Sequence, residues 1–328
     1  MMKNIAIVAG GYSSEQVVSV KSAAGVYSFI DKDKYRLYVV LLTEKSWKVQ
    51  LSDGTQSEID KNDFGFMADG KKITFDFAYI TIHGTPGENG LLQGYFDMIG
   101  LPYSCCGVLA AALTFNKYIC NNYLKSFGIR TAQSIRLCAG ETISNEAVVE
   151  QLGLPVFIKP NDGGSSFGTN KVKTPEAIQP AIASAFAEGK EVIIEAFMAG
   201  TEVTCGCYKI RGKAVVFPVT EVVSKNEFFD FEAKYVADKV EEITPARISP
   251  ALTEEVQALT SRIYDLVGAK GIIRVDYIIA AEGEIRMLEV NTTPGMTATS
   301  FIPQQVKAAG LSIRDVMTDI IENELKKE

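Results

Sequence analysis

The sequence predicts an α/β fold followed by an α+β region, namely an N-terminal doubly wound parallel-sheet domain and then two further lobes. Over roughly the first third of the chain, short apolar runs alternate with helical patterns, which is typical of a parallel sheet covered by helices. Beyond that third, paired strands joined by glycine turns replace the alternation and indicate antiparallel sheets. The 328 residues are enough for two or three domains of roughly 100–200 residues each.

The N-terminal domain is predicted to comprise residues 1–115. Its expected elements, together with the helix that leaves it, are a strand at 4–9, a helix at 14–29, strands at 35–42 and 75–82, and helices at 90–99 and 107–127. The strands are apolar runs, such as NIAIVA, that are too short for buried helices. Gly10-Gly11 ends the first strand and Gly128 follows the last helix, because glycine adopts turn conformations that other residues avoid.

The central lobe is predicted over residues 116–200. Its expected elements are strands at 156–160 and 169–173, a helix that begins at Pro175, and a strand at 191–197. Pro175 suits the first turn of a helix, where its missing N–H leaves no hydrogen bond unmade. The loop between the first two strands is rich in glycine and serine, so we expect it to be functional.

The C-terminal lobe is predicted over residues 201–328. Its expected elements are a hairpin of strands 202–210 and 213–223, a helix at 250–267, and strands at 272–279 and 284–291. The hairpin turns at Arg211-Gly212, and Gly268 ends the helix. Residues 224–248 show no clear periodicity and are predicted to form a long loop, a kind of segment that usually carries function or is disordered.

The composition argues against two classes of function. A net charge of -7 argues against a nucleic-acid binder, because such proteins usually present a basic face. No apolar run reaches the roughly 18 residues that span a bilayer, and the N-terminal run is shorter than a secretory signal requires. The six cysteines lack a metal-binding spacing and fit free thiols in a reducing compartment. We therefore expect a cytoplasmic protein that binds neither nucleic acid nor membrane.

The last two predicted strands carry polar residues where core residues would be expected, since Glu289 and Asn291 lie two residues apart in MLEVNTTPGMT. If Glu282-Gly283 form the turn, the numbers of paired residues sum to 565. Asp276 then lies opposite Glu289, and Arg274 lies opposite Asn291. Because strand side chains alternate, all four project from one face of the sheet.

Two carboxylates directly opposite each other repel, and a divalent cation would remove that penalty. Mg²⁺ prefers oxygen ligands and usually takes only a few from the protein. Asp276, Glu289 and Asn291 are therefore candidate metal ligands, although a surface acid pair balanced by Arg274 explains the same residues. The other face of the two strands is predicted to be covered by Val275, Tyr277, Leu288 and Val290.

The stretch KPNDGGSSFG, residues 159–168, is a candidate phosphate loop. Its glycines let the backbone approach an anion, and consecutive N–H groups can form an anion-binding nest. Ser165 and Ser166 add hydroxyl donors, and Lys159 adds a positive charge. The spacing is not that of a Walker loop, and a flexible turn is the alternative. A candidate magnesium site in the same chain favours nucleotide phosphates, because Mg²⁺ commonly bridges them.

Taken together, these motifs resemble those of the ATP-grasp ligases, and most closely those of the D-alanine–D-alanine ligase family. The resemblance covers nearly the whole chain and follows the family's order: GGYSSE (10–15), IHGTPGENG (82–90), IKPNDGGSSFG (158–168), FEAKY (231–235), IRVDY (273–277) and LEVNTTPGMT (288–297). It implies that the two further lobes form an ATP-grasp region. It also implies that ATP phosphorylates one D-alanine, that the amine of a second attacks, and that the dipeptide serves peptidoglycan synthesis.

The resemblance implies a metal set and a nucleotide set of residues. Asp276, Glu289 and Asn291 match ligands for two Mg²⁺ ions, or Mn²⁺ in their place. The residues that match ATP contacts are Lys117, Lys159, Ser165, Ser166, Glu195, Phe197, Met198, Glu202 and Lys234. Within this set Glu195 matches the acid that accepts the adenine amino group, and Glu202 the acid that faces the ribose. Without the resemblance, Lys117 would be interpreted as a solvated helix residue.

The resemblance also implies a site for the first D-alanine and a lid. Glu15 matches the acid that holds the ammonium group of this substrate; alone, it would be an acid favoured by a helix N-terminus. Ser165 and Tyr235 match the residues that connect Glu15 to the covering loop. Residues 224–248 then form a lid that excludes water from the acylphosphate.

Further residues match groups around the reacting atoms. His83, the only histidine, matches the residue near the first D-alanine; whether it also moves a proton stays open. Arg274 and the backbone N–H of Gly295 match the groups that stabilise the oxyanion. Ser300 and the main chain of Phe301 match the site of the second substrate's carboxylate.

Two rival functions follow from the same residues. A D-alanine–D-lactate ligase would use the same fold, but Tyr235 in FEAKY favours the dipeptide enzyme. A non-catalytic nucleotide-binding regulatory module would need neither Arg274 nor Ser165 nor Tyr235. The expected partners are ATP and D-alanine, and the family resemblance implies a homodimer.

Overall fold

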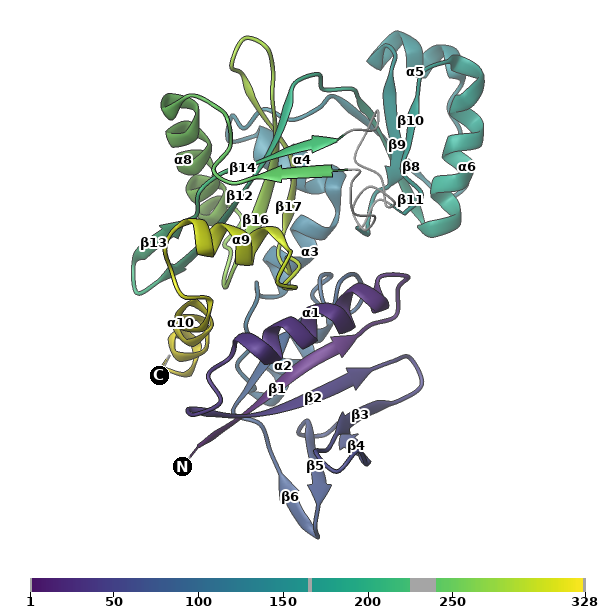
Figure 1. Cartoon of the computed structure of the whole chain (residues 1–328). Helices are drawn as coiled ribbons and strands as arrows, with labels where there is room; N and C mark the ends of the chain where they lie inside the picture. Colours follow the sequence, from purple (N-terminus) through teal and green to yellow (C-terminus); the bar gives the residue numbers. More distant parts are fainter. Residues whose placement is uncertain (1, 165–166, 225–239, 327–328) are drawn as a thin grey trace.

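The computed structural model describes residues 2–164, 167–224 and 240–326, and within these residues the strands form three sheets (Figure 1). The first sheet has seven strands in the order β6-β5-β4-β3-β2-β1-β7, and the second has four in the order β10-β9-β11-β8. The third has the order β15-β14-β12-β16-β17, with β13 paired to β12. This mixed α/β architecture confirms the predicted fold class.

The first sheet contains the three predicted strands as its parallel core. The elements are β1 (Lys3–Gly10), α1 (Gln16–Phe29), β2 (Tyr35–Leu42), β3 (Trp47–Gln50), β4 (Gln56–Asp60), β5 (Gly65–Ala68), β6 (Lys71–Ile73), β7 (Phe77–Ile80) and α2 (Leu91–Ile99). β1 pairs in parallel with β2 and β7. β3 to β6 extend the sheet antiparallel and were not predicted, because they are short and lack a long apolar run.

The predicted helix at 107–127 is two helices, α3 (Val108–Phe115) and α4 (Lys117–Lys125). The chain turns at Asn116, which has extended backbone angles and whose side chain accepts a hydrogen bond from the Ile119 N–H. Lys117 is therefore the first residue of α4. Ala110, Cys120 and other buried residues of these helices join the core of the third sheet.

The second sheet carries the phosphate-loop segment at one end. Its elements are β8 (Ser134–Cys138), α5 (Asn145–Leu152), β9 (Val156–Pro160), β10 (Asn170–Val172), the 3₁₀ turn η1 (Pro175–Ala177), α6 (Ile178–Glu188) and β11 (Glu191–Ala196). All strands are antiparallel, and α6 packs on the sheet through Ile178, Ile182 and Ala185. The helix predicted from Pro175 thus begins as a 3₁₀ turn.

The third sheet carries the candidate metal ligands. Its elements, with the helices that cover it, are β12 (Thr201–Ile210), β13 (Lys213–Val216), β14 (Thr220–Ser224), β15 (Val240–Ile243), α8 (Pro250–Leu266), β16 (Ile273–Ile279), β17 (Ile285–Asn291), α9 (Phe301–Ala308) and α10 (Ile313–Leu325). The predicted strand 213–223 is broken before β14, where Pro218 has no N–H to donate. The prediction of a loop throughout 224–248 is wrong at β15, which pairs with β14, while residues 225–239 lie outside the described part.

The predicted pairing of β16 with β17 is confirmed at the candidate metal ligands, since Asp276 lies opposite Glu289 and Arg274 lies opposite Asn291. The predicted two-residue turn is wrong. Ala280 N–H donates to the Glu284 carbonyl at 2.9 Å, which leaves the three residues 281–283 in the turn and lowers the sum of paired numbers to 564.

A β-bulge at Leu288 restores the predicted register, because the pairing shifts between Asp276 and Tyr277. In a regular strand after this turn, Glu289 would lie on the same buried face as Met287, because side chains two positions apart share a face. Leu288 itself packs beside Met198 and Ile278 instead of covering the core face, so its predicted placement was wrong.

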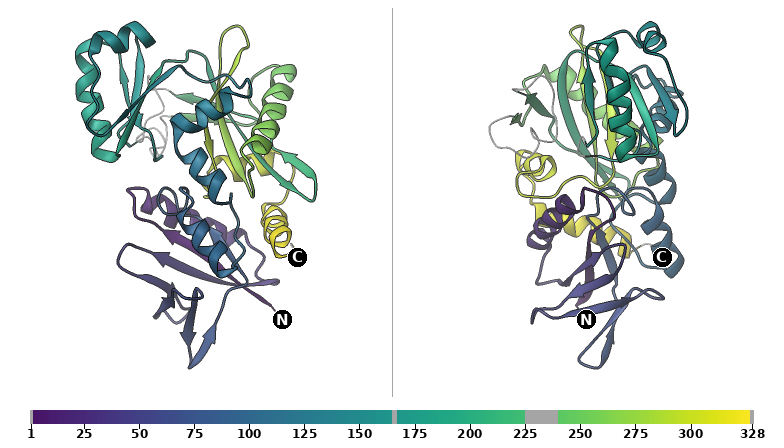
Figure 2. Two further views of the ribbon diagram at one scale, coloured as in Figure 1. Left: turned by 180° about the vertical axis from the view of Figure 1, so that it is seen from behind. Right: turned by 90° about the vertical axis from the view of Figure 1, so that its right-hand side faces the viewer.

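The C-terminal helices return to the first domain, as Figure 2 shows. Ile302 of α9 and Ile320 of α10 lie in one hydrophobic cluster with Ile7 and Val26. The approach is very close at Gly25 of α1, where an added Cβ would lie 1.9 Å from the Met296 carbonyl oxygen. The first and third parts of the chain are therefore packed as one unit.

This close approach predicts an asymmetry between two glycines in helix interiors. We expect Gly25→Ala to destabilise the protein by about 1–3 kcal/mol through overpacking. Gly94→Ala in α2 is the matched control, because its Cβ would meet nothing closer than 3.7 Å and alanine favours helices. Chemical denaturation of both variants gives the two changes, and equal stabilities would contradict the described packing.

Candidate functional site

A cavity of about 1180 Å³ is lined by residues of all three parts of the chain. Every predicted site residue in the described part of the chain lines it: Glu15, His83, Lys117, Lys159, Glu195, Phe197, Met198, Glu202, Arg274, Asp276, Glu289, Asn291, Gly295, Ser300 and Phe301. The predicted residues Ser165, Ser166, Lys234 and Tyr235 lie outside the described residues. Among the predicted residues, the cavity thus brings together positions up to 286 apart, from Glu15 to Phe301.

The end of the cavity that carries the candidate metal ligands is centred on Asp276, which is buried. Its two carboxylate oxygens each accept a hydrogen bond of 2.8 Å from the Arg274 guanidinium. The Thr204 hydroxyl donates to Oδ1 at 2.5 Å, and the Asn291 amide donates to Oδ2 at 3.0 Å. Burial opposes the charge on Arg274, but nearby Asp276 and Glu289 outweigh it and raise the pKa of the guanidinium.

The donor set at this end fits a hard divalent cation. Asp276 and Glu289 are paired across the two strands, and Asn291 offers its amide oxygen while its nitrogen faces Asp276. Oxygen ligands of this number and kind are typical of Mg²⁺ sites that share the ion with a nucleotide. Within the described residues no cluster of three His, Cys, Asp or Glu side chains has metal-binding geometry, so a metal here would need Asn291 or a substrate oxygen.

A buried ion pair lies at the end of the cavity that carries Glu195, Phe197 and Met198. Lys159 Nζ lies 2.6 Å from Glu195 Oε2, and Asn121 donates to Glu195 Oε1 at 3.0 Å. Burial alone would lower the pKa of Lys159, but Glu195 and Glu289 reverse this and raise it, so the lysine stays charged. Phe197 and Met198 follow directly after the strand that carries Glu195 and line the same end.

Asn161 fixes the phosphate-loop segment to the start of α4. Its carbonyl accepts from the Lys117 N–H at 3.0 Å, and its side chain accepts from the Tyr118 N–H at 2.8 Å. The Lys117 ammonium contacts the Gly163 carbonyl oxygen. Burial lowers the pKa of Lys117 although Glu289 opposes the shift, so binding an anion here would stabilise the charged form.

The end of the cavity that carries His83 is organised by α1. The Ser22 hydroxyl lies 3.3 Å from His83 Nε2 and accepts a hydrogen bond of 3.4 Å from the Met296 N–H. It therefore connects the His83 loop with the turn that contains Gly295. Burial, assisted by Arg274, lowers the pKa of His83 to about 4, so this imidazole is neutral at pH 7.

Glu15 is buried just before α1, where the glycine loops come close to it. An added Cβ on Gly164 would lie 2.8 Å from Glu15 Oε1, and one on Gly84 would lie 3.2 Å from Oε2. Glu88 accepts a hydrogen bond of 2.7 Å from the Gly84 N–H, and burial together with Glu15 raises the pKa of Glu88. Two acids thus face this end.

Several residues that hold the site were not predicted. The supporting residues are Ser22, Asn121, Asn161, Thr204 and Gln304. Only Asn121 gave a usable signal, since it lies four positions after Lys117 and therefore on the same helix face. The others contact partners far away in the sequence, which no local spacing indicates.

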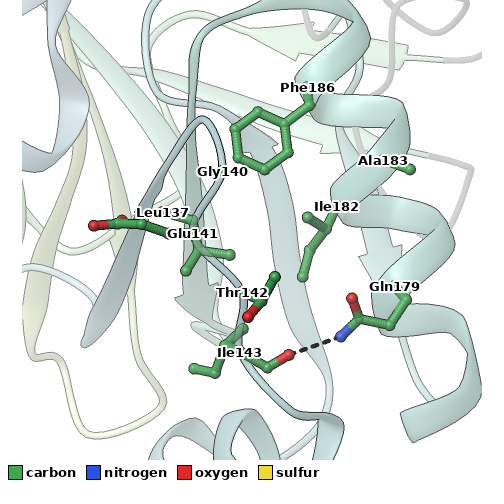
Figure 3. A pocket seen from close by; sticks show the side chains of 9 residues that line it. All are labelled: Leu137, Gly140, Glu141, Thr142, Ile143, Gln179, Ile182, Ala183 and Phe186. Carbon is green, nitrogen blue, oxygen red and sulfur yellow. Dashed lines mark hydrogen bonds between the residues drawn. The ribbon is translucent and has the colours of Figure 1, made fainter.

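A second cavity, of about 290 Å³, lies between the end of β8 and α6 (Figure 3). Its wall is both apolar and polar, with Ile182 and Phe186 on α6 and with Glu141 and Thr142 after β8. Gln179 donates to the Ile143 carbonyl at 2.9 Å. It contains none of the predicted site residues.

None of the described helices combines the length and the apolarity needed to cross a bilayer.

Two sequence models of one family match the chain. The model described as D-ala D-ala ligase N-terminus matches residues 4–106, and the model described as D-ala D-ala ligase C-terminus matches residues 123–322.

Curated proteins with the name D-alanine--D-alanine ligase are similar over nearly the full length. The protein of Parabacteroides distasonis is 70% identical over 326 residues, which cover 99% of this chain and 98% of the relative. That of Porphyromonas gingivalis is 55% identical over 324 residues, with 98% of each chain covered.

Solved structures of the same kind are similar in fold. The VanG D-Ala:D-Ser ligase from Enterococcus faecalis has a TM-score of 0.86 at 30% identity and covers 99% of this chain and 100% of that chain. The D-alanine--D-alanine ligase from Bacillus anthracis complexed with ATP has a TM-score of 0.77 at 28% identity, with coverage of 99% and 98%. The chain therefore belongs to the D-alanine–D-alanine ligase family.

Proposed function

We propose that this chain is an ADP-forming ligase that joins two D-alanines at the expense of ATP and supplies D-alanyl-D-alanine for peptidoglycan synthesis in the cytoplasm. The observation that carries the proposal is that one cavity is lined by the proposed metal ligands, by Lys117 and Lys159, and by the turn that contains Gly295. Its volume of about 1180 Å³ is ample for a nucleotide and two amino acids.

In the proposed reaction, a carboxylate oxygen of the first D-alanine attacks the γ-phosphorus of ATP, and ADP leaves. The amine of the second D-alanine then attacks the acyl carbon, phosphate leaves with the bonding electrons, and the amine loses a proton. We assign the binding of phosphate oxygens to Lys117 and Lys159. We assign the stabilisation of the negative charge that develops on the carbonyl oxygen to the Arg274 guanidinium and the Gly295 N–H.

We assign the two proposed Mg²⁺ ions, or Mn²⁺ in their place, to Asp276, Glu289 and Asn291. When bound, such ions neutralise phosphate charge and align the γ-phosphoryl group. Arg274 holds the Asp276 carboxylate in a fixed orientation through two hydrogen bonds. A loosely held acid would have to be ordered when the ion binds, which costs free energy.

We assign the first D-alanine to the end with Glu15 and His83. A buried carboxylate beside open space is suited to an ammonium group, and Glu15 is such a residue. A neutral imidazole can donate one hydrogen bond without adding a charge next to Arg274. We therefore propose that His83 orients the first substrate.

A D-alanine–D-lactate ligase is the second candidate, because a similar fold serves a ligase with another second substrate, as the Enterococcus faecalis structure is titled. Comparing D-alanine with D-lactate as second substrate across pH decides between the two. A preference for D-lactate near neutrality would overturn the dipeptide assignment. A non-catalytic regulatory module is the third, and it predicts that D-alanine causes no release of phosphate from ATP.

We propose a homodimer, as expected for the family. An apolar surface on α2 and α3 supports this assembly: Met98 is 89% exposed and Leu109 is 79% exposed, with Leu91 and Val108 beside them. α3 has no charged side chain at all, which is unusual for a helix with a solvent-exposed face. Sedimentation at micromolar concentration should give twice the monomer mass.

The metal assignment predicts the loss of turnover without loss of fold. We expect Asp276→Asn and Glu289→Gln each to lower D-alanine-dependent phosphate release by at least about 100-fold, since each removes a charged metal ligand. Glu282→Gln in the exposed turn of the same hairpin is the matched control and should retain activity. Phosphate release is measured with ATP, magnesium and D-alanine, with L-alanine as the inactive substrate; full activity in either site variant would remove the metal assignment.

The neutral state of His83 can be measured directly, because the chain has a single histidine. We expect its NMR signals to stay unchanged down to about pH 5 and to titrate near 4. The urea-unfolded chain is the control and should titrate near 6.5. As pH falls from about 6.5 to about 4, the unfolded state binds a proton that the folded state excludes, so stability falls by roughly 3 kcal/mol. A folded-state midpoint near 6.5 would contradict the assignment.

A further inference from the structure

We propose that Glu242 makes the second-substrate site selective for a nucleophile that carries an ammonium group. This inference rests on the proposed function and names the feature of the second substrate that the site recognises. Glu242 was not among the predicted site residues, and it lies on β15, the strand that was expected to be part of a loop.

Glu242 is placed in the corner proposed for the second D-alanine. β15 pairs antiparallel with β14, and Glu242 lies opposite Val222. Its half-buried side chain lines the cavity together with Arg274, Ser300 and Phe301. The Arg274 guanidinium lies 5.2 Å from the centre of the Phe301 ring, so these residues occupy the same corner.

The carboxylate of Glu242 is held in position by Gln304. Gln304 Nε2 donates to Glu242 Oε2 at 2.6 Å and to the Thr299 carbonyl at 2.7 Å. Both amide hydrogens are therefore used. Gln304 belongs to α9, which begins directly after Ser300, so the carboxylate is fixed relative to the proposed substrate turn.

The charge of this corner favours a cationic group. Arg274 already donates two hydrogen bonds to Asp276, so Glu242 is not required to balance it. Two more acids line this part of the cavity: Glu202 lies opposite Val222 on β12, and Glu221 is paired with Arg247 at 2.8 Å. Burial raises the pKa of Glu242, while the Gln304 hydrogen bond and Arg274 oppose the shift. An ammonium group bound beside this carboxylate would gain a charge–charge attraction as well as a hydrogen bond, whereas a hydroxyl group could only donate a hydrogen bond.

The second substrate brings such a group only when it is an amino acid. D-Alanine and D-serine enter as zwitterions, whereas D-lactate carries a carboxylate and a hydroxyl. A hydroxy acid would place its negative charge near Glu242 without compensation. The ammonium group must lose a proton before the nitrogen attacks, and Glu242 acts before that step by binding and orienting the substrate.

A structural role for Glu242 predicts different outcomes from a selective role. Glu242→Gln removes the charge but keeps an oxygen that can accept from Gln304, so the connection between β15 and α9 survives. Gln304→Met breaks the connection and leaves the charge. Glu241→Gln is the matched control, because Glu241 is the exposed neighbour on the same strand.

The experiment measures the KM of the second-site D-alanine and the inhibition constant of D-lactate against it, with Mg²⁺ and ATP saturating. For Glu242→Gln we expect the ratio of KM to this inhibition constant to rise about tenfold, the size of one charge interaction near a surface. The KM values for ATP and for the first D-alanine should be unchanged. Glu241→Gln should behave like the parent protein.

An unchanged ratio in Glu242→Gln, with a change only in Gln304→Met, would overturn the proposal and leave a structural connection. A rise in the first-site or ATP KM of the same size would also overturn it, because the effect would then be general. If the parent protein releases no phosphate with D-alanine, the proposed function itself fails, which is a distinct result. Thermal unfolding of each variant verifies that the fold is retained.

Discussion

The cavity depends on the pairing of β16 with β17, because this hairpin decides which side chains face the cavity. The three-residue turn alone would direct Glu289 into the hydrophobic core, beside Tyr277 and Met287. The extra residue at Leu288 reverses the alternation over the last part of β17. Glu289 and Asn291 then share a face with Asp276, and Leu288 contributes an apolar contact beside Met198. The one extra residue thus decides whether the Glu289 carboxylate lies in the cavity or in the core.

The charges around this hairpin are arranged as linked pairs. Asp276 is bound by Arg274, and Glu195 is bound by Lys159, so burial of each charge is compensated by a partner at hydrogen-bond distance. Polar residues then hold the members of each pair: Thr204 and Asn291 hold Asp276, while Asn121 holds Glu195. The consequence is a preorganised cavity whose polar groups do not have to be rearranged before a charged substrate binds.

The parts of the structure that the sequence predicts are those with local signals. The apolar runs of β1, β2 and β9 predicted these strands, and the facing of Asp276 and Glu289 followed from strand alternation. The Leu288 bulge was missed because two irregularities cancel. The turn is one residue longer than predicted and β17 contains one extra residue, so the pairing of Asp276 with Glu289 is the same as in a hairpin with neither. The break at Asn116 was missed because asparagine, although favoured at helix caps, also occurs inside helices, so one such residue does not mark a boundary. The helix of Ser22 was predicted, but its contacts with His83 and Met296 span 61 and 274 positions. Most of the predicted site residues came from the family resemblance, since spacing alone singled out only the hairpin and the glycine loop.

The hydrophobic cluster shared by α1, α9 and α10 has a mechanical consequence. Residues from both ends of the chain lie within it, so the seven-stranded sheet and the sheet of β12 to β17 are joined by a common core. The lobe of β8 to β11 has its own separate core around Ile158 and Ile194. Any opening that admits ATP is therefore expected to be a rigid-body swing of that smaller lobe, with Glu15, His83 and Ser300 staying in place on the larger body.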